Sequence, residues 1–427
     1  MASSAKGERF YYGWKIVFCG FLCLFFGQVL YTNCAGAYTA AITEEFGFSR
    51  SSFTLYLSIS SAVMMISSPF IGRLLERGNT KVIMVVLQIV QALCYLGFTV
   101  CTELWQFYCF AVGLGLGFAG VIRLAPAILV NFWFGPKLRG RAMAFVTAGS
   151  GIGALTILPL ITKIITTYGW RYGYYTAAAI LIFFVTPCFL FIVSTPEKKG
   201  IAKRGEYTEE EKSSLNEEKS GMQVQQALKT PEFVCMVVAM LLLAIAATGL
   251  LTNVQVYLTD LGYDPTTAAA YTAVASGLLT VGKFVLGFLA DKFGLKSTTN
   301  FAIGTFVFVF LCLFFTSYWG PAVFGFVAIY GIGGSIAVFL PPLITARIFG
   351  NRDYGAIYGS VNLASGVGTT IGPVSVALIF DITGSYKYAW LGIAALVLVA
   401  GIAFYLAMAL AEKRQMKAAR AAVATEQ

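Results

Sequence analysis

Long apolar stretches separated by short polar or charged segments follow one another along almost the whole chain. A helix that spans a bilayer needs about 20 mostly apolar residues. Twelve stretches reach this length, and they predict transmembrane helices over 13–41, 51–73, 81–101, 105–133, 140–166, 170–193, 232–258, 266–290, 298–318, 321–349, 354–380 and 386–410. The six tryptophans fall near the ends of these stretches, where interfacial aromatic residues gather: Trp14, Trp105, Trp133, Trp170, Trp319 and Trp390. The pattern predicts an all-α integral membrane protein.

The composition excludes several other classes of protein. Of the 427 residues 58% are apolar and 12% are charged, against about 25% charged residues in a soluble domain. The twelve stretches leave too little sequence for a soluble catalytic domain. There is no histidine for a metal site or a proton relay, and the nine cysteines lie in apolar stretches without a CxxC pair. We therefore expect no enzyme activity, no metal and no cofactor.

The distribution of Lys and Arg predicts the orientation. With a cytoplasmic N-terminus, 23 of the 30 basic residues lie on the cytoplasmic side and only Arg50, Lys163, Arg171 and Lys387 lie outside. This asymmetry predicts that both termini are in the cytoplasm and that the chain resides in the cytoplasmic membrane. It also accounts for most of the net charge of +10 without a nucleic-acid partner, and the expected surroundings are the lipid bilayer.

The two halves of the chain match at a constant offset of 215 residues. Gly72 and Glu76 fall on Gly287 and Asp291, and further pairs are Gly47 with Gly262, Gly153 with Gly368, and Gly169 with Gly384. The predicted organisation is a six-helix bundle over 1–193, a charged cytoplasmic linker over 194–230, a second six-helix bundle over 231–411 and a cytoplasmic tail over 412–427. Parallel repeats of this kind are typical of transporters, with the substrate site near the midplane between the halves.

A loop signature identifies the fold family that this chain resembles. The pattern Gly-x-Leu-x-Asp-Arg-x-Gly of the major facilitator superfamily is matched weakly by Gly72–Gly78 and better by Gly287–Gly294. In that superfamily the acid of the signature caps a helix and pairs with a cytoplasmic arginine, which locks one conformation. The resemblance implies a conformational gate formed by Glu76, Arg77, Arg139, Arg141, Asp291 and Lys292.

Within the superfamily, three features are similar to bacterial monocarboxylate porters and the oxalate/formate antiporter group. They are the opening Tyr12-Gly13-Trp14, the turn Trp133-Phe134-Gly135, and the glycine-rich fifth span. That group carries a cation in the eighth span for its anion, and Lys283 occupies the matching place. Two features depart from the group: the eleventh span has no lysine, and Leu279 stands where monocarboxylate porters often have an aspartate.

Two basic residues lie deep inside predicted spans. Arg123 is in the fourth span and Lys283 is in the eighth, whereas no span interior contains Asp or Glu. A charge at a span centre costs roughly 2.5–3.5 kcal/mol on insertion scales, and a substrate carboxylate would relieve that cost. We expect polar residues of the spans to complete the substrate path: Tyr31, Asn33, Asn253, Tyr257, Tyr330, Tyr358 and Asn362.

These observations predict a monomeric secondary transporter for a small organic anion, a mono- or dicarboxylate, working by alternating access. Exchange against a second anion, proton-linked transport and facilitated diffusion all remain open. The alternative is a neutral or zwitterionic substrate, with Arg123 and Lys283 in structural roles. A membrane sensor is disfavoured because the central linker is too short for an output domain.

Overall fold

We describe the chain from a computed structural model covering residues 11–201, 204–205, 221–350 and 352–425, with the side chains of 76–77, 136–137, 197 and 417–425 outside the description. Within these ranges the regular structure is helical, and β-structure is limited to two isolated bridges, Phe134 with Arg204 and Gly221 with Gly350. The expectation of an all-α membrane fold is confirmed.

The first half of the chain folds into spans that are partly α-helical and partly π-helical. Their segments are α1 (Gly13–Leu22), η1 (Cys23–Asn33), α2 (Ala35–Phe46), α3 (Arg50–Arg77), α4 (Thr80–Phe98), α5 (Leu104–Gly117), η2 (Phe118–Leu124), α6 (Ala125–Trp133), α7 (Pro136–Tyr168), α8 (Trp170–Ile180), η3 (Leu181–Val185), α9 (Thr186–Cys188), η4 (Phe189–Phe191) and η5 (Pro196–Lys199). The segments η1, η2 and η3 are π-helical, which the hydrophobic pattern does not predict.

The second half begins with the short helix α11 (Val224–Ala227) and continues with long helices. The long helices are α12 (Pro231–Asp260), α13 (Pro265–Thr316), α14 (Ala322–Phe349), α15 (Tyr354–Thr383) and α16 (Lys387–Thr425). In the described part of the chain, 11 helical segments are long and apolar enough to cross a membrane. One of them, α13, is broken at Gly294, whose φ of 79° is not helical. It therefore contains the two predicted spans 266–290 and 298–318, in agreement with a twelve-span chain.

The chain divides into two compact units. Unit 1 comprises Met1–Ala35 and Val63–Lys212, and unit 2 comprises Gly36–Ala62 and Ser213–Gln427. The segment 36–62, which belongs to the first repeat by sequence, thus packs with the helices of the second repeat. The sequence-based limits of the two bundles stay a prediction.

The backbone geometry repeats at the offset found in the sequence. Gly47 and Gly262 both have positive φ values, 67° and 89°, and so do Gly169 and Gly384, at 97° and 67°. This left-handed region is one that glycine enters without a steric penalty. A third pair allows close helix packing: a side chain at Gly153 would collide with the carbonyl oxygen of Phe25 in unit 1, and one at Gly368 with that of Leu241 in unit 2.

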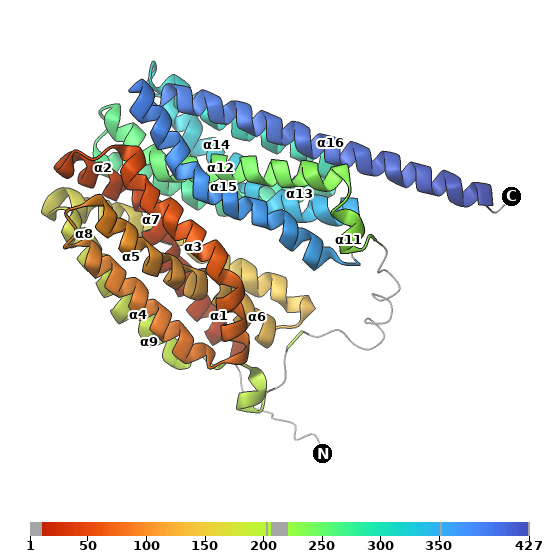
Figure 1. The fold of residues 1–427 in the computed structure, drawn as a ribbon, viewed down its shortest axis with the longest axis horizontal. Helices are drawn as coiled ribbons and strands as arrows, with labels where there is room; N and C mark the ends of the chain where they lie inside the picture. The colour runs from red at the N-terminus through yellow and green to blue at the C-terminus, as the bar shows by residue number, and fades with distance from the viewer. Residues whose placement is uncertain (1–10, 202–203, 206–220, 351, 426–427) are drawn as a thin grey trace. The chain divides into compact units, whose positions relative to one another are not determined.

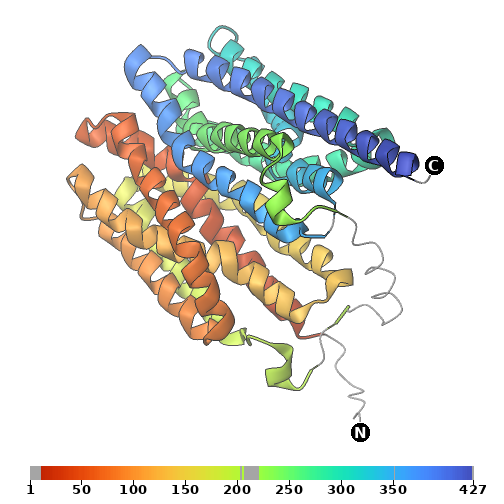
Figure 2. The same cartoon turned by 45° about the vertical axis from the view of Figure 1, so that its right-hand side comes forward.

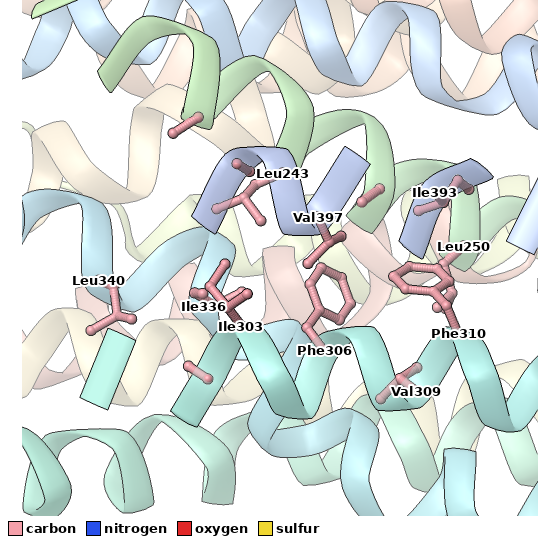
Figure 3. Close-up of a cluster of buried hydrophobic side chains, with 14 of the residues drawn as sticks. Leu243, Leu250, Ile303, Phe306, Val309, Phe310, Ile336, Leu340, Ile393 and Val397 are labelled. Carbon is pink, nitrogen blue, oxygen red and sulfur yellow. The ribbon is translucent and has the colours of Figure 1, made fainter. Parts of the chain in front are cut away.

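The core of unit 2 lies where α12, α13, α14 and α16 meet. Leu243 and Leu250 of α12 point toward Phe306 and Phe310 of α13, with Val397 of α16 beside them (Figure 3). These side chains are buried because their helices present apolar faces on more than one side. Lipid tails are as apolar as leucine, so tight packing rather than hydrophobicity holds such helices together.

The last helix continues far beyond its predicted span of 386–410. At about 1.5 Å per residue, the 39 residues of α16 extend about 58 Å, against a hydrocarbon core of about 30 Å. Its final turns project past the ends of α12 and α13 (Figure 1), while α12, α15 and the first part of α16 pack together (Figure 2).

Substituting Gly368 tests the close approach of α15 to α12. A methyl group at this position would lie 2.5 Å from the carbonyl oxygen of Leu241, and overpacking of this kind costs about 1–3 kcal/mol. We expect Gly368→Ala to lower the melting temperature of the purified protein. Gly359→Ala, on the same helix with open space around it, is the control and should leave the melting temperature unchanged or raise it.

Candidate substrate-binding site

The helix α13 places Lys283 deep within its first span. Asp264 precedes the helix, and its carboxylate accepts hydrogen bonds from the backbone N–H groups of Thr266, at 3.0 Å, and Thr267, at 3.2 Å. A hydrogen bond from the Thr266 hydroxyl holds the pKa of Asp264 below its ordinary value. The carboxylate is therefore charged, and a negative charge at the N-terminus stabilises the helix. Lys283 follows Pro265 by about 27 Å and precedes Gly294 by about 17 Å along the axis, at 1.5 Å per residue.

The Lys283 side chain is half-buried, and it makes no hydrogen bond or ion pair with any other residue in the described ranges. The neighbouring Gly282 presses on α14, since a side chain there would collide with the carbonyl oxygen of Gly331. The backbone around Lys283 is therefore tightly fixed while its ammonium group has no protein partner in the described ranges. A cation in that situation favours an anionic ligand.

Two of the predicted site residues on α12 use their polar atoms to join helices of unit 2. The amide nitrogen of Asn253 donates to the carbonyl oxygens of Gly249, at 3.0 Å, and Pro373 of α15, at 3.2 Å. The hydroxyl group of Tyr257 bonds the Leu313 carbonyl oxygen and lies 2.9 Å from the Ser317 hydroxyl. In this structure both residues serve helix packing.

The remaining candidates of unit 2 divide into one core residue and one half-buried pair. Tyr330 of α14 is 1% exposed, and its ring centroid lies 5.6 Å from that of Phe326. Tyr358 and Asn362 are half-buried and one turn apart on α15, so they share a face of the helix. Among the described residues, Asn362 makes no hydrogen bond and, like Lys283, keeps its polar group available.

The candidates of unit 1 lie on two π-helical segments that pack on each other. The ring of Tyr31 in η1 lies 4.1 Å from that of Phe118 in η2, centroid to centroid, and a side chain at Gly27 would strike Ile122. Arg123, the next residue of η2, is exposed, while Asn33 at the end of η1 is buried. π-Helical turns inside α-helices occur frequently at functional sites, and here they carry three of the predicted residues.

The structure describes four residues of the predicted gate: Arg139, Arg141, Asp291 and Lys292. The side chains of Glu76 and Arg77 lie outside the described residues. Arg139 donates to the Asn131 side-chain oxygen at 3.0 Å, and Arg141, Asp291 and Lys292 are exposed. The pairing of Glu76 with Arg139 or Arg141 stays a prediction.

An ionic network that the sequence did not reveal fastens α16 at the end of unit 2 where Lys and Arg gather, here called the basic end. Arg414 contacts Glu232, the first-turn acid of α12, at 3.0 Å, and the Glu232 side chain is only 4% exposed. Glu412 pairs with Lys296 at 2.6 Å and with Arg347 at 3.7 Å. Arg347, at the end of the tenth span, is thereby engaged with α16.

A second cluster missed from the sequence lies at the opposite end of unit 2. The guanidinium group of Arg50, the first residue of α3, forms two hydrogen bonds with the Asp260 carboxylate, one of them 2.7 Å long. It also lies 4.1 Å from the ring centroid of Phe380. The Asp381 carboxylate accepts from the backbone N–H groups of Arg50, at 3.2 Å, and Ser51, at 2.8 Å, and so caps α3. The only hint in the sequence was that Arg50 is one of four outer cations.

This arrangement contains no group of three or more metal-binding side chains among the described residues. Apolar spans arranged as a duplicated set, with polar residues and one cation deep in each half, define a membrane transport protein. A family profile described as the Major Facilitator Superfamily matches residues 17–346 and 280–425. The chain belongs to this superfamily, so it is a multi-pass membrane transporter and not an enzyme, and the predicted resemblance is confirmed.

Known proteins similar to this chain transport different compounds. Monocarboxylate transporter 4 of Gallus gallus is 24% identical, over 91% of this chain and 81% of its own. The oxalate:formate antiporter of Oxalobacter formigenes is 29% identical, over 61% and 60%. The riboflavin transporter MCH5 of Saccharomyces cerevisiae is 23% identical, over 79% and 65%. These relatives are thus named for compounds as different as monocarboxylates, oxalate and riboflavin.

A solved structure shows the same fold. The inward-facing, unoccupied form of a bacterial homologue of the human lysosomal transporter Spinster superimposes with a TM-score of 0.74, covering 95% of this chain and 99% of that one at 16% identity.

Breaking the contact between Arg414 and Glu232 tests the ionic network at the basic end. Arg414→Gln leaves the buried Glu232 carboxylate without its cation, and a buried group stripped of its partner costs about 1–3 kcal/mol. We expect a lower melting temperature, with part of the loss recovered in the double variant Arg414→Gln/Glu232→Gln. Lys413→Gln, at an exposed neighbouring position, is the control and should have no effect. Equal losses in the single and double variants would contradict the pairing.

Proposed function

We propose that this chain transports a small organic anion, a mono- or dicarboxylate, across the cytoplasmic membrane by alternating access. The observation that carries the proposal is the ammonium group of Lys283, half-buried in the middle of a span and unbonded to any described residue. No Asp or Glu occurs inside a predicted span to neutralise it. A substrate carboxylate supplies the missing charge, and binding is favoured because the lysine is already partly desolvated.

Two further observations support an anionic substrate. Asn362 offers a side-chain amide that no other described residue engages, and an amide N–H donates well to a carboxylate. Relatives named as a monocarboxylate transporter and an oxalate:formate antiporter match the chain. Arg123 of unit 1 is the second cation that we assign to the substrate, as a bidentate partner for a carboxylate.

The absence of Asp, Glu and His from the interiors of the predicted spans bears on how transport is coupled. A proton-coupled transporter commonly uses an intramembrane acid or histidine as its proton site, and the spans of this chain contain neither in their interiors. Exchange of one anion for another needs no such group, whereas proton-linked transport requires Lys283 itself to release a proton. A neutral substrate is the competing function, favoured by the similarity to a riboflavin transporter.

The Arg50 cluster supplies one barrier of the transport cycle in this proposal. Alternating access requires each end of the substrate path to open in turn. At the end opposite the basic end, the Arg50 side chain ties α3 to Asp260 of α12, and Asp381 of α15 bonds the backbone of α3. We assign these contacts to the closed state of that end, where they are released when it opens. If both termini are cytoplasmic, as the distribution of Lys and Arg predicts, this barrier faces the outside of the cell.

Neutralising Lys283 tests the substrate class. In proteoliposomes loaded and assayed with formate, lactate, oxalate or succinate, we expect Lys283→Gln to reduce transport at least tenfold, while Lys283→Arg keeps measurable transport. In a thermal-shift assay, a ligand at one hundred times its dissociation constant stabilises the folded protein by about 2.7 kcal/mol, and Lys283→Gln should abolish that stabilisation.

The control for this experiment is Lys163→Gln, an exposed lysine of α7, which should transport and bind as the wild type does. Unchanged carboxylate transport in Lys283→Gln would refute the role of Lys283. If only a neutral compound raises the melting temperature, the two span cations are structural and the competing function holds.

Removing the Arg50 charge tests the barrier. Ser58, two turns further along α3, is 7% exposed, so a cysteine at this position reports on opening. In a background with the exposed Cys109 changed to Ser, we expect Arg50→Gln to increase the labelling rate of Ser58→Cys by a water-soluble maleimide several-fold. Lys163→Gln is the control. An unchanged rate with an unchanged melting temperature would show that Arg50 does not hold this end closed.

A further inference from the structure

A groove in the described part of unit 1 opens beside the first turns of α1. It has a volume of about 610 Å³ and is lined by Trp14, Lys15, Phe18, Cys19, Phe145, Cys188 and Phe191. The side chains of Phe18, Phe145 and Phe191 are about half exposed, at 52%, 49% and 57%. These residues come from α1, α7, α9 and η4, all of which are membrane-spanning segments. The groove is therefore an apolar hollow on a surface that lies within the bilayer.

Basic side chains gather at one end of this groove, around Tyr12. The ammonium nitrogen of Lys199 lies 3.4 Å from the centroid of the Tyr12 ring, and that of Lys15 lies 5.2 Å from it. The Tyr12 hydroxyl donates to the carbonyl oxygen of Phe191 at 2.7 Å, which ties these cations to the groove. A third ammonium group, that of Lys81, contacts the Leu190 carbonyl oxygen at 3.4 Å. None of the described residues that line the groove is acidic.

The apolar hollow and the cations around Tyr12 match the acyl chain and the headgroup of a lipid. A site that is apolar along its length and basic at one end is complementary to a phospholipid with a net negative headgroup. Trp14 marks the depth of the headgroups, since tryptophan is enriched at the membrane interface. A zwitterionic lipid would fill the hollow equally well but would gain much less from the cations. We propose that this groove binds an anionic phospholipid, with an acyl chain along Phe18, Phe145 and Phe191 and the phosphate group at Lys15 and Lys199.

Quenching of Trp14 by brominated acyl chains tests the proposal. The protein is placed in phosphatidylcholine bilayers that contain a small, equal fraction of either brominated phosphatidylglycerol or brominated phosphatidylcholine. The difference in fluorescence between the wild type and Trp14→Phe isolates the signal of Trp14. We expect phosphatidylglycerol to be preferred at Trp14, by about fivefold for each lysine that contacts its headgroup. In Lys15→Gln/Lys199→Gln the two lipids should quench Trp14 equally.

Two controls separate a specific site from general contact with lipid. Trp105, which is 62% exposed on α5, should be quenched equally by both lipids, and Lys163→Gln should leave the preference at Trp14 intact. Equal quenching of Trp14 by the two lipids in the wild type would overturn the proposal, as would a preference that survives in the double lysine variant.

A measurement that does not depend on Trp14 covers the case in which Trp14→Phe fails to fold. The protein is purified from a mixed membrane, and its retained phospholipids are identified by mass spectrometry. The wild type should retain phosphatidylglycerol in preference to phosphatidylcholine, and Lys15→Gln/Lys199→Gln should not. The same retention in both proteins would also overturn the proposal.

Discussion

A peptide group inside a bilayer has no water to bond, and this constraint governs how every polar atom of the chain is used. Backbone groups satisfy one another within helices, and the helices then approach closely where glycine leaves room, as at Gly153, Gly282 and Gly368. Polar side chains in the spans face the same demand, and Asn253 and Tyr257 meet it by bonding carbonyl oxygens of neighbouring helices. Against this background Lys283 is an exception in the described part of the chain, because its ammonium group is half-buried and bonds no other described residue. Our proposal that Lys283 binds the substrate rests on this cation, which has no partner among the described residues.

Much of the architecture could be predicted from the sequence, because length and hydropathy decide which segments span a bilayer. The spans 266–290 and 298–318 are an example: they are separated at Gly294 even though the helix is otherwise continuous over Pro265–Thr316. The 215-residue offset could also be read directly, and it recurs as matched backbone geometry at Gly47 and Gly262. Of the candidate site, the depth of Lys283 along its helix was predictable because an α-helix rises regularly with each residue.

Features that depend on tertiary packing could not be predicted in the same way. The π-helical turns of η1 and η2 carry Tyr31 and Arg123, and nothing in an apolar run distinguishes them from α-helix. The partners of Arg50 lie at residues 260 and 381, a distance along the chain that no local pattern spans. Tyr257 and Asn253 are polar residues in an apolar span, which is equally typical of a substrate contact and of an interhelical bond. Only their partners in the folded chain distinguish these roles.

The capping of α3 by Asp381 also bears on how the protein is made. The N–H groups at the start of α3 are completed by a carboxylate 330 residues later in the chain. At about 5–20 residues per second, a ribosome needs on the order of 15–65 s to synthesise that interval. During this time α3 is inserted with an open N-terminus, and the Arg50 guanidinium gains its partner Asp260 before the cap at Asp381 is made. The second span of the newly made chain therefore reaches its final state only when the eleventh arrives, so the last stage of assembly completes a helix that was among the first to enter the membrane.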